Sequence, residues 1–92
     1  MTTWYAYLLC CRDGTLYVGI TMDVDRRFRE HCRGIGSKFV RSRGVDHLVA
    51  WRVVGDATAA RRLERRLKAM TRVRKIMFFA PSVYTGYLPR PS

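Results

Sequence analysis

The stretch from Trp4 to Ile20 constrains the fold more than any other part of this chain. Residues 4–11 (WYAYLLCC) and 16–20 (LYVGI) are rich in residue types that favour strands. Asp13-Gly14 lies between them and is typical of a tight hairpin turn. Side-chain alternation gives the first strand two faces, with Tyr5, Tyr7 and Leu9 on one and Ala6, Leu8 and Cys10 on the other.

A helix is expected after the hairpin, capped by Thr21 or Asp23 and running to about Cys32. The spacing i, i+3, i+4 and i+7 defines the stripe that faces the protein body, here Val24, Arg27, Phe28 and His31. Arg27 and His31 are polar, although the solvated face already carries other arginines. We therefore expect both side chains to be held against the body.

The remainder predicts one more strand and two more helices. Arg33 to Val45 is rich in glycine and basic residues and is expected to be a loop. Leu48 to Val54 is expected to be a strand, and the helices to begin at Asp56 or Thr58 and at Thr71. The expected inward residues are Ala60, Leu63, Leu67 and Met70 in the first helix, and Val73, Ile76, Met77 and Ala80 in the second.

Ninety-two residues suffice for one domain with a thin core. We place this domain at residues 1–80. From Pro81 onward, three prolines and scattered tyrosines predict an extended C-terminal tail, residues 81–92, packed on the body through Tyr84, Tyr87 and Leu88.

The charge of the chain is strongly unbalanced. Eighteen Lys and Arg against seven Asp and Glu give a net charge of +11, and most of the bases are Arg. Arginine suits bidentate phosphate contacts, so a nucleic acid partner is favoured; an acidic protein or an anionic membrane surface would also fit. The sequence has neither an apolar run near the ~20 residues that span a bilayer nor a signal-peptide pattern, which predicts a cytoplasmic protein, nucleoid-associated in a bacterium.

The three cysteines, Cys10, Cys11 and Cys32, lack C-x-x-C spacing. In a cytosolic chain they are expected to stay reduced and to act as small buried apolar residues. A zinc site built from Cys10, Cys32 and His31 is the alternative.

Several scattered residues suit phosphodiester hydrolysis, which needs an activated water, neutralised phosphoryl charge, and a proton or metal for the leaving oxygen. Glu64 is the one acid between residue 57 and the end of the chain, against nine Lys and Arg, and is the candidate metal-binding carboxylate. The other candidates are an arginine to clamp the phosphate and three groups to transfer or position protons: Arg27, His31, Tyr7 and Tyr17.

Each candidate also has a structural interpretation. Glu64 could form a helix salt bridge with Lys68. Arg27 could lay its stem over Phe28 with its head in solvent, and His31 could be placed by the helix dipole. The tyrosines could simply pack in strands.

Glycine and basic residues supply the candidate nucleic-acid contacts. Gly19, inside a strand, predicts a bulge or a close backbone approach, and either would leave room for a phosphate beside Tyr17. The glycine-rich basic loop could wrap phosphates through its amides. The candidate nucleic-acid-binding residues are Gly19, Arg26, Lys38, Arg41 and Arg43.

The joint order of these residues is more specific than any one of them. Tyr-x-Tyr, then Tyr-x-Gly, then Arg and His on a helix, then a distant Glu resembles the GIY-YIG nuclease family, most closely its small single-domain bacterial members. The matching stretches are WYAYLLCCRDGTLYVGITMDVDRRFREH, GIGSKFVRSRG and ATAARRLERRLKAMT. Tyr5-Ala6-Tyr7 replaces the literal Gly-Ile-Tyr, and Val18 replaces the Ile.

The resemblance implies an α+β fold (an α/β sandwich), with a three-stranded antiparallel sheet flanked by about three helices. It implies that Tyr7, Tyr17, Arg27, His31 and Glu64 are catalytic, with Glu64 binding one Mg²⁺ or Mn²⁺ ion. Between the tyrosines, Tyr17 is the favoured proton-transferring group and Tyr7 the positioning one.

The main hypothesis is a metal-dependent endonuclease acting on DNA rather than RNA, including branched, nicked or damaged forms, with a protein partner for targeting. One alternative is a nucleic-acid-binding module whose site is idle or slow. The other is a basic adaptor of a repair complex.

Overall fold

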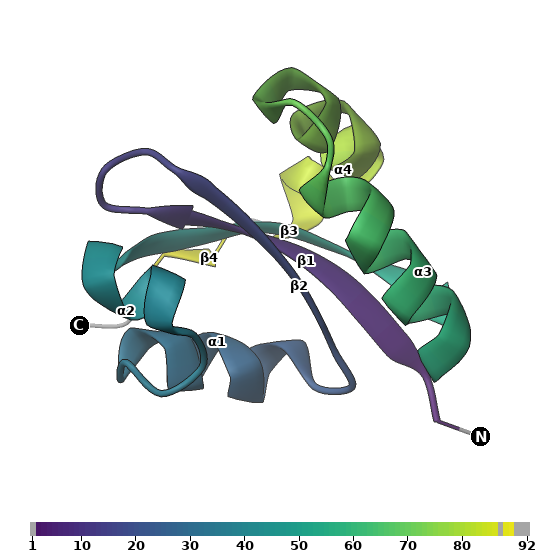
Figure 1. The fold of residues 1–92 in the computed structure, drawn as a ribbon, viewed down its shortest axis with the longest axis horizontal. Helices are drawn as coiled ribbons and strands as arrows, with labels where there is room; N and C mark the ends of the chain where they lie inside the picture. The colour runs from purple at the N-terminus through teal and green to yellow at the C-terminus, as the bar shows by residue number, and fades with distance from the viewer. Residues whose placement is uncertain (1, 87, 90–92) are drawn as a thin grey trace.

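The computed structural model describes residues 2–86 and 88–89 of the chain. The first two strands form one sheet with a strand from the middle of the chain, and helices lie on both faces of this sheet (Figure 1). The elements are β1 (Trp4–Cys11), β2 (Leu16–Thr21), α1 (Val24–Cys32), α2 (Lys38–Arg43), β3 (Val45–Gly55), α3 (Ala57–Lys68), α4 (Arg72–Gly86) and β4 (Leu88–Pro89).

The sheet has the order β2-β1-β3-β4, and every neighbouring pair is antiparallel. Its three long strands, β1, β2 and β3, confirm the predicted three-stranded antiparallel sheet and the α+β class. The two-residue β4 adds a short edge beside His47 and Leu48. In the part of the chain that the structure describes, four helices flank the sheet, rather than about three, because a short helix forms between α1 and β3.

The two faces of the sheet carry separate cores. α1 and α2 cover one face, and α3 and α4 cover the other (Figure 1). The core on the α1 side contains Tyr7, Leu9, Cys11, Phe28, Val40, Val45 and Leu48. The core on the α3 side contains Ala6, Leu8, Val18, Ala50, Leu67 and Phe79. The predicted alternation of side chains along the first strand is therefore confirmed for Ala6, Tyr7, Leu8 and Leu9.

Local hydrogen bonds explain where the helices begin. The Asp23 carboxylate accepts from the Arg26 amide and caps α1, while Thr21 accepts from the Asp23 amide and shapes the turn before it. The Asp56 carboxylate accepts from the Ala59 amide and caps α3. Side-chain acceptors at these positions satisfy amides that would otherwise lack partners.

The loop expected over Arg33 to Val45 is partly wrong, because Lys38–Arg43 forms α2. The Ser37 hydroxyl accepts from the Val40 amide, and Val40 is fully buried in the core beneath α1. This burial stabilises one short helix despite the surrounding glycines. The third strand also starts earlier than expected, at Val45, and ends at Gly55.

The inward stripe predicted for the last helix is wrong. Val73 and Met77 are 64% and 67% exposed, whereas Phe79 is fully buried. The Arg52 guanidinium donates to the Phe78 carbonyl and stacks over the Phe78 ring, which fixes the side of α4 that faces the sheet. The aromatic pair buries more apolar area than the aliphatic stripe would, so it sets the orientation of the helix.

The extended tail is also wrong over residues 81–86, because α4 continues to Gly86 and crosses the boundary expected at residue 80. The packing expected for Tyr84, Tyr87 and Leu88 lies outside the described side chains. Within residues 2–86 and 88–89, none of the helices combines the length and apolarity that a bilayer crossing needs.

The burial of Phe79 gives a direct stability test. Phe79→Ala should lower the free energy of unfolding by about 3–5 kcal/mol, because it opens a cavity between α4 and the sheet. Met77→Ala, on the exposed side of the same helix, should change it by less than about 0.5 kcal/mol. Urea unfolding measures both. Equal costs for the two variants would contradict the observed orientation of α4.

Candidate active site

A buried hydrogen bond between Tyr7 and His31 forms the centre of the candidate site. Tyr7 Oη lies 2.7 Å from His31 Nε2 and joins β1 to α1. Both residues are only 2% exposed. A polar pair this deep restricts both side chains to one arrangement, because an unpaired hydroxyl or imidazole is costly in the core.

Two glycines make room for this pair. A Cβ atom on Gly19 would lie 2.3 Å from Tyr7 Oη, and one on Gly36 would lie 2.7 Å from His31 Nδ1. No side chain fits at either position unless the rings move. The Tyr7 ring therefore fills the space where a side chain on residue 19 would lie. Gly19 thus helps to place Tyr7, and its contact with a nucleic acid stays a prediction.

Tyr17 is half-buried beside this pair, on the edge strand β2. Its ring centroid lies 5.5 Å from that of His31 and 6.4 Å from that of Tyr7. Tyr17 also lines a surface cleft of about 360 Å³ together with Phe39, Lys68 and Lys75. Tyr17 thus connects the buried pair to a solvent-accessible surface rich in lysine.

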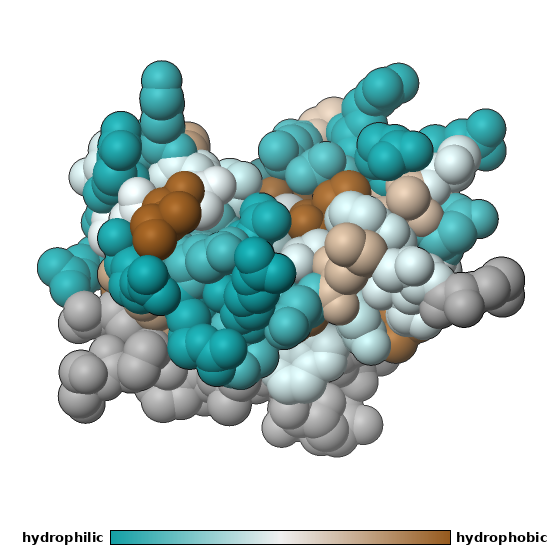
Figure 2. Space-filling view, turned by 90° about the horizontal axis from the view of Figure 1, so that it is seen from below, coloured by the Kyte–Doolittle hydropathy of each residue, from teal (hydrophilic) through white to brown (hydrophobic). Residues whose placement is uncertain are grey.

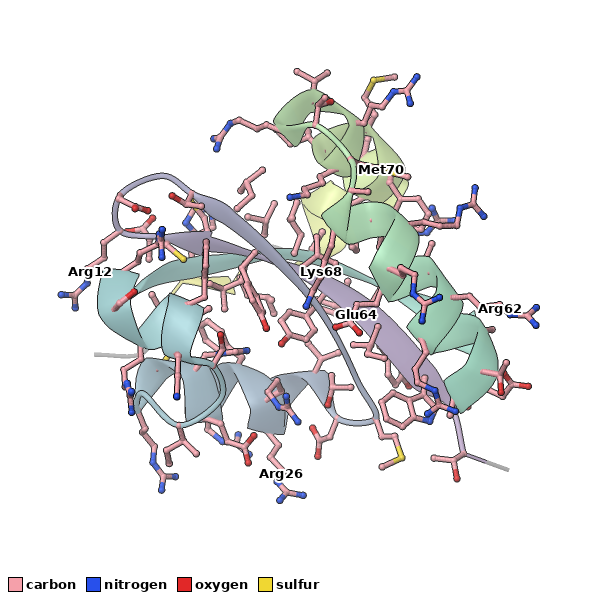
Figure 3. The ribbon with its side chains drawn as sticks, in the orientation of Figure 1. Arg12, Arg26, Arg62, Glu64, Lys68 and Met70 are labelled. Carbon is pink, nitrogen blue, oxygen red and sulfur yellow. The ribbon has the colours of Figure 1, made fainter. Side chains whose placement is uncertain are left out.

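Glu64 and Lys68 approach the same region from α3. In Figure 3 both side chains point from α3 towards the sheet, whereas Arg62 points away from it. Lys68 Nζ lies 3.4 Å from Glu64 Oε2 and 5.6 Å from the centroid of the Tyr17 ring. The predicted Glu64–Lys68 salt bridge is therefore present, and it lies on the side of the protein where Tyr17 is exposed.

Arg27 is the second charged group beside the buried pair. Its Nε lies 3.0 Å from Glu30 Oε1, and its side chain is 38% exposed. The guanidinium is close enough to Tyr7 and His31 to influence the pKa of both. The helix spacing predicted that Arg27 and His31 face the protein body, and both lie near Tyr7. Phe28, on the same stripe of the helix, is buried.

Burial keeps both members of the central pair neutral near pH 7. It raises the pKa of Tyr7 well above its usual value; the nearby Tyr17 and Glu64 add to this rise, and Arg27 opposes it. Burial, reinforced by the Arg27 charge, lowers the pKa of His31 to about 4, against a smaller opposing effect of Glu30. The neutral phenol and imidazole share the 2.7 Å hydrogen bond, and the two pKa shifts both oppose full transfer of the proton from Tyr7 to His31.

His31 Nδ1 is buried without a hydrogen-bond partner among the described residues. An unsatisfied nitrogen in a core is unusual, and such groups gather at functional sites. The ring thus makes its one short hydrogen bond to Tyr7 and lies against Gly36 on its other side.

The other predicted nucleic-acid contacts lie on the surface. Lys38 and Arg41 are exposed on α2. Arg26 points away from the body in Figure 3 and pairs with Glu30 at 3.3 Å. Arg43 pairs with Asp13 at 3.3 Å, and its guanidinium carbon lies 3.8 Å from the centroid of the Phe39 ring. Figure 2, seen from the side of α1, shows a largely hydrophilic surface that suits contact with a charged polymer.

Sequence reasoning missed several residues of this region. Phe39 and Gly36 fall in the segment expected to be a loop, so their contacts with Tyr17 and His31 were not foreseen. The helix pattern predicts Lys68 only as a partner of Glu64, and no sequence pattern points to Lys75. The lysine at i+4 from Glu64 was a usable signal, because helix geometry puts both side chains on one face.

Possible metal ligands lie in two places. The described residues contain one group of three, Cys10, Asp46 and His47, whose ligand atoms lie within 4.8 Å of one another. Glu64 stands apart from it as a single carboxylate. The alternative zinc site of Cys10, Cys32 and His31 is wrong, because Cys32 packs against the α1-side core while Cys10 lies with Asp46 and His47.

Comparison with known proteins decides the family. A model described as the GIY-YIG catalytic domain matches residues 3–76. The chain belongs to the GIY-YIG family. This match confirms the resemblance based on Tyr5-Ala6-Tyr7 and Tyr17-Val18-Gly19.

Relatives and one solved structure agree with this membership. The UPF0213 protein XAC3202 of Xanthomonas axonopodis is 36% identical over 97% of this chain and 87% of its own. The UPF0213 protein YhbQ of Escherichia coli is 44% identical over 82% of this chain and 75% of its own. The solution NMR structure of the UPF0213 protein BH0048 of Bacillus halodurans is 39% identical, with a TM-score of 0.51 over 83% of this chain and 81% of that one.

The contact between Gly19 and Tyr7 predicts a strong coupling between the two positions. Gly19→Ala should lower the free energy of unfolding by about 1–3 kcal/mol, since the new methyl group collides with the Tyr7 ring. In a Tyr7→Leu background the same change should cost less than about 1 kcal/mol, because the colliding atoms are gone. A double-mutant cycle by chemical denaturation measures this; additive costs would refute the packing argument.

The low pKa of His31 predicts a dependence of stability on pH. The folded value of about 4 lies below the ordinary 6.5, so the unfolded chain binds the extra proton between these two values. The contribution of His31 to the free energy of unfolding is therefore complete above about pH 6.5 and is lost as the pH falls towards 4. The total change is about 3 kcal/mol.

Urea unfolding between pH 4.5 and 7 in EDTA checks this dependence. His31→Gln should flatten the slope, whereas the matched variant His47→Gln should keep it. If His31→Gln kept the wild-type dependence of the free energy of unfolding on pH, another titrating group would be responsible.

Proposed function

We propose that this protein is an endonuclease that hydrolyses phosphodiester bonds in DNA with the help of a divalent metal ion. The observation that carries the proposal is the buried Tyr7–His31 hydrogen bond of 2.7 Å, beside Tyr17 and within electrostatic reach of Arg27 and Glu64. Protein cores rarely hold such a pair for packing alone, because two apolar residues would cost less to bury.

The cleft beside Tyr17 supports a nucleic-acid substrate. Lys68 and Lys75 supply positive charge to it, and Phe39 adds an aromatic wall. Lys38 and Arg41 continue the basic surface along α2, and the whole chain carries a net charge of +11. Such a surface attracts a phosphate backbone through release of counterions.

The donor set around Glu64 fits Mg²⁺ or Mn²⁺. Glu64 offers a carboxylate that is 28% exposed and lies within electrostatic reach of Tyr7. Magnesium is commonly held by one or two carboxylates, with waters and substrate phosphates completing the shell. When bound to Glu64, the ion would neutralise charge on the phosphoryl group and on the leaving oxygen.

The protein side chains divide the remaining tasks by their exposure. Arg27, partly exposed, would donate to the phosphoryl oxygens and hold the phosphate in place. Tyr17, at the wall of the cleft, would contact the attacking water and take part in its proton transfer. Tyr7 and His31 lie behind it and would orient the site, with His31 Nε2 able to accept a hydrogen bond from the Tyr7 hydroxyl.

Branched, nicked or damaged DNA is the substrate that we favour, with a protein partner for targeting and a cytoplasmic, nucleoid-associated location in a bacterial cell. The Glu64–Lys68 ion pair of 3.4 Å supports a second candidate function. If this pair stayed closed in the presence of the metal, the protein would bind nucleic acid without cutting it.

Cleavage assays with Mg²⁺ or Mn²⁺ on supercoiled, nicked and branched DNA, and on RNA, test the proposal. Arg27→Ala and Glu64→Gln should each slow cleavage about 100-fold or more, because each removes charge stabilisation from the transition state. Arg62→Ala, an exposed arginine that points away from the site in Figure 3, should cut at the wild-type rate.

Binding to the same DNA, measured over a range of salt concentrations, separates the alternatives. Unchanged cleavage by both Arg27→Ala and Glu64→Gln would refute the assignment of the site. Salt-dependent binding without cleavage of any substrate by the wild type would favour the idle binding module. Absence of both would leave the adaptor of a repair complex.

A further inference from the structure

A second group of chemically reactive side chains lies outside the candidate active site. Cys10 on β1 and Asp46 and His47 on β3 place one ligand atom each within 4.8 Å of the other two. Cys10 pairs across the sheet with His47 on one side and with Leu16, the first residue of β2, on the other. The group therefore lies at the end of the sheet where the β1–β2 hairpin turns.

A β-bulge explains how two consecutive residues join this group. Cys10 is opposite His47, but Cys11 is opposite Val45, so Asp46 is an extra residue in β3. In a regular strand Asp46 and His47 would point to opposite faces; a bulge re-aims one of them. The Asp46 carboxylate instead lies 2.7 Å from His47 Nδ1.

The burial of the three side chains suits an ion that enters from solvent. Asp46 is 60% exposed and the His47 side chain 19% exposed, so one side of the group is open. Cys10 is partly buried, and its thiol makes a weak hydrogen bond of 3.5 Å to the Cys11 carbonyl. Weak hydrogen bonding leaves the sulfur free to become a ligand.

The charges of the group favour a cation between its members. A Cys10 thiolate would lie within 4.8 Å of the Asp46 carboxylate, so two negative charges would repel each other there. A bound divalent cation would turn this repulsion into attraction and displace the thiol proton into the solvent.

We propose that Cys10, Asp46 and His47 bind a zinc ion, separate from the hard metal ion expected at Glu64. A sulfur, an imidazole nitrogen and a carboxylate oxygen are the donors that zinc prefers, whereas magnesium prefers oxygen alone. Three protein ligands leave a fourth position to water on the open side of Asp46. The ion joins β1 to β3 at the bulge and stabilises the hairpin end of the sheet.

Binding of Co²⁺ and Zn²⁺ to the tag-free chain tests this proposal. Co²⁺ should bind one ion per chain with the near-ultraviolet charge-transfer absorption of a cobalt–thiolate bond, and Zn²⁺ should displace it. Zn²⁺ should also raise the melting temperature in a concentration-dependent way. Cys10→Ser and His47→Gln should abolish both signals, and Asp46→Asn should weaken the affinity about 10-fold or more.

Cys32→Ser, which removes a cysteine on the other face of the sheet, is the matched control and should bind like the wild type. Metal binding that survives in Cys10→Ser, or that is lost in Cys32→Ser, would overturn the proposal, as would the absence of thiolate absorption in the wild type. Circular dichroism of each metal-free variant checks that it is folded.

This outcome is independent of the nuclease proposal. Glu64→Gln should keep the zinc signals, and Cys10→Ser should keep cleavage with Mg²⁺. If Glu64→Gln lost the zinc signals, the ion would bind at Glu64 and the proposed site would be wrong.

Discussion

The hydrogen bond between Tyr7 and His31 is the interaction on which the rest of the site depends. It links the central strand β1 to α1 inside a closed core, where water cannot substitute for either partner. Gly19 and Gly36 exist at their positions because a Cβ atom at either would strike one of the two rings. Tyr17 packs beside the pair from the edge strand β2, with its ring against both partners.

Around this pair the protein separates neutral groups from charged ones. Tyr7 and His31 are buried and neutral, while Arg27 and Glu64 keep part of their surface in solvent, where their charges cost less. Lys68 connects the two regions, since it pairs with Glu64 and lies over Tyr17. The zinc site proposed at the hairpin end depends instead on a β-bulge, which brings Asp46 and His47 to the same side of β3.

Local patterns explain which parts of this fold could be predicted. Asp13-Gly14 between two strand-forming segments and the caps at Asp23 and Asp56 act within a few residues, so they can be read from the chain. Helix α2 could not, because its stability comes from Val40 buried in a distant core. The predicted orientation of α4 was wrong for a similar reason. Burial of Phe79 in the core outweighed the periodicity of Val73 and Met77.

The sequence by itself determined the order of the three long strands along the chain, the family, and the candidate residues Tyr7, Tyr17, Arg27, His31 and Glu64, because residue types and their spacing carry that information. The tertiary structure alone decided that Tyr7 fills the space at Gly19 and that Lys68 and Phe39 border the cleft. It alone brought Cys10 to His47. Such contacts join residues far apart in the chain, and packing of the whole core selects them.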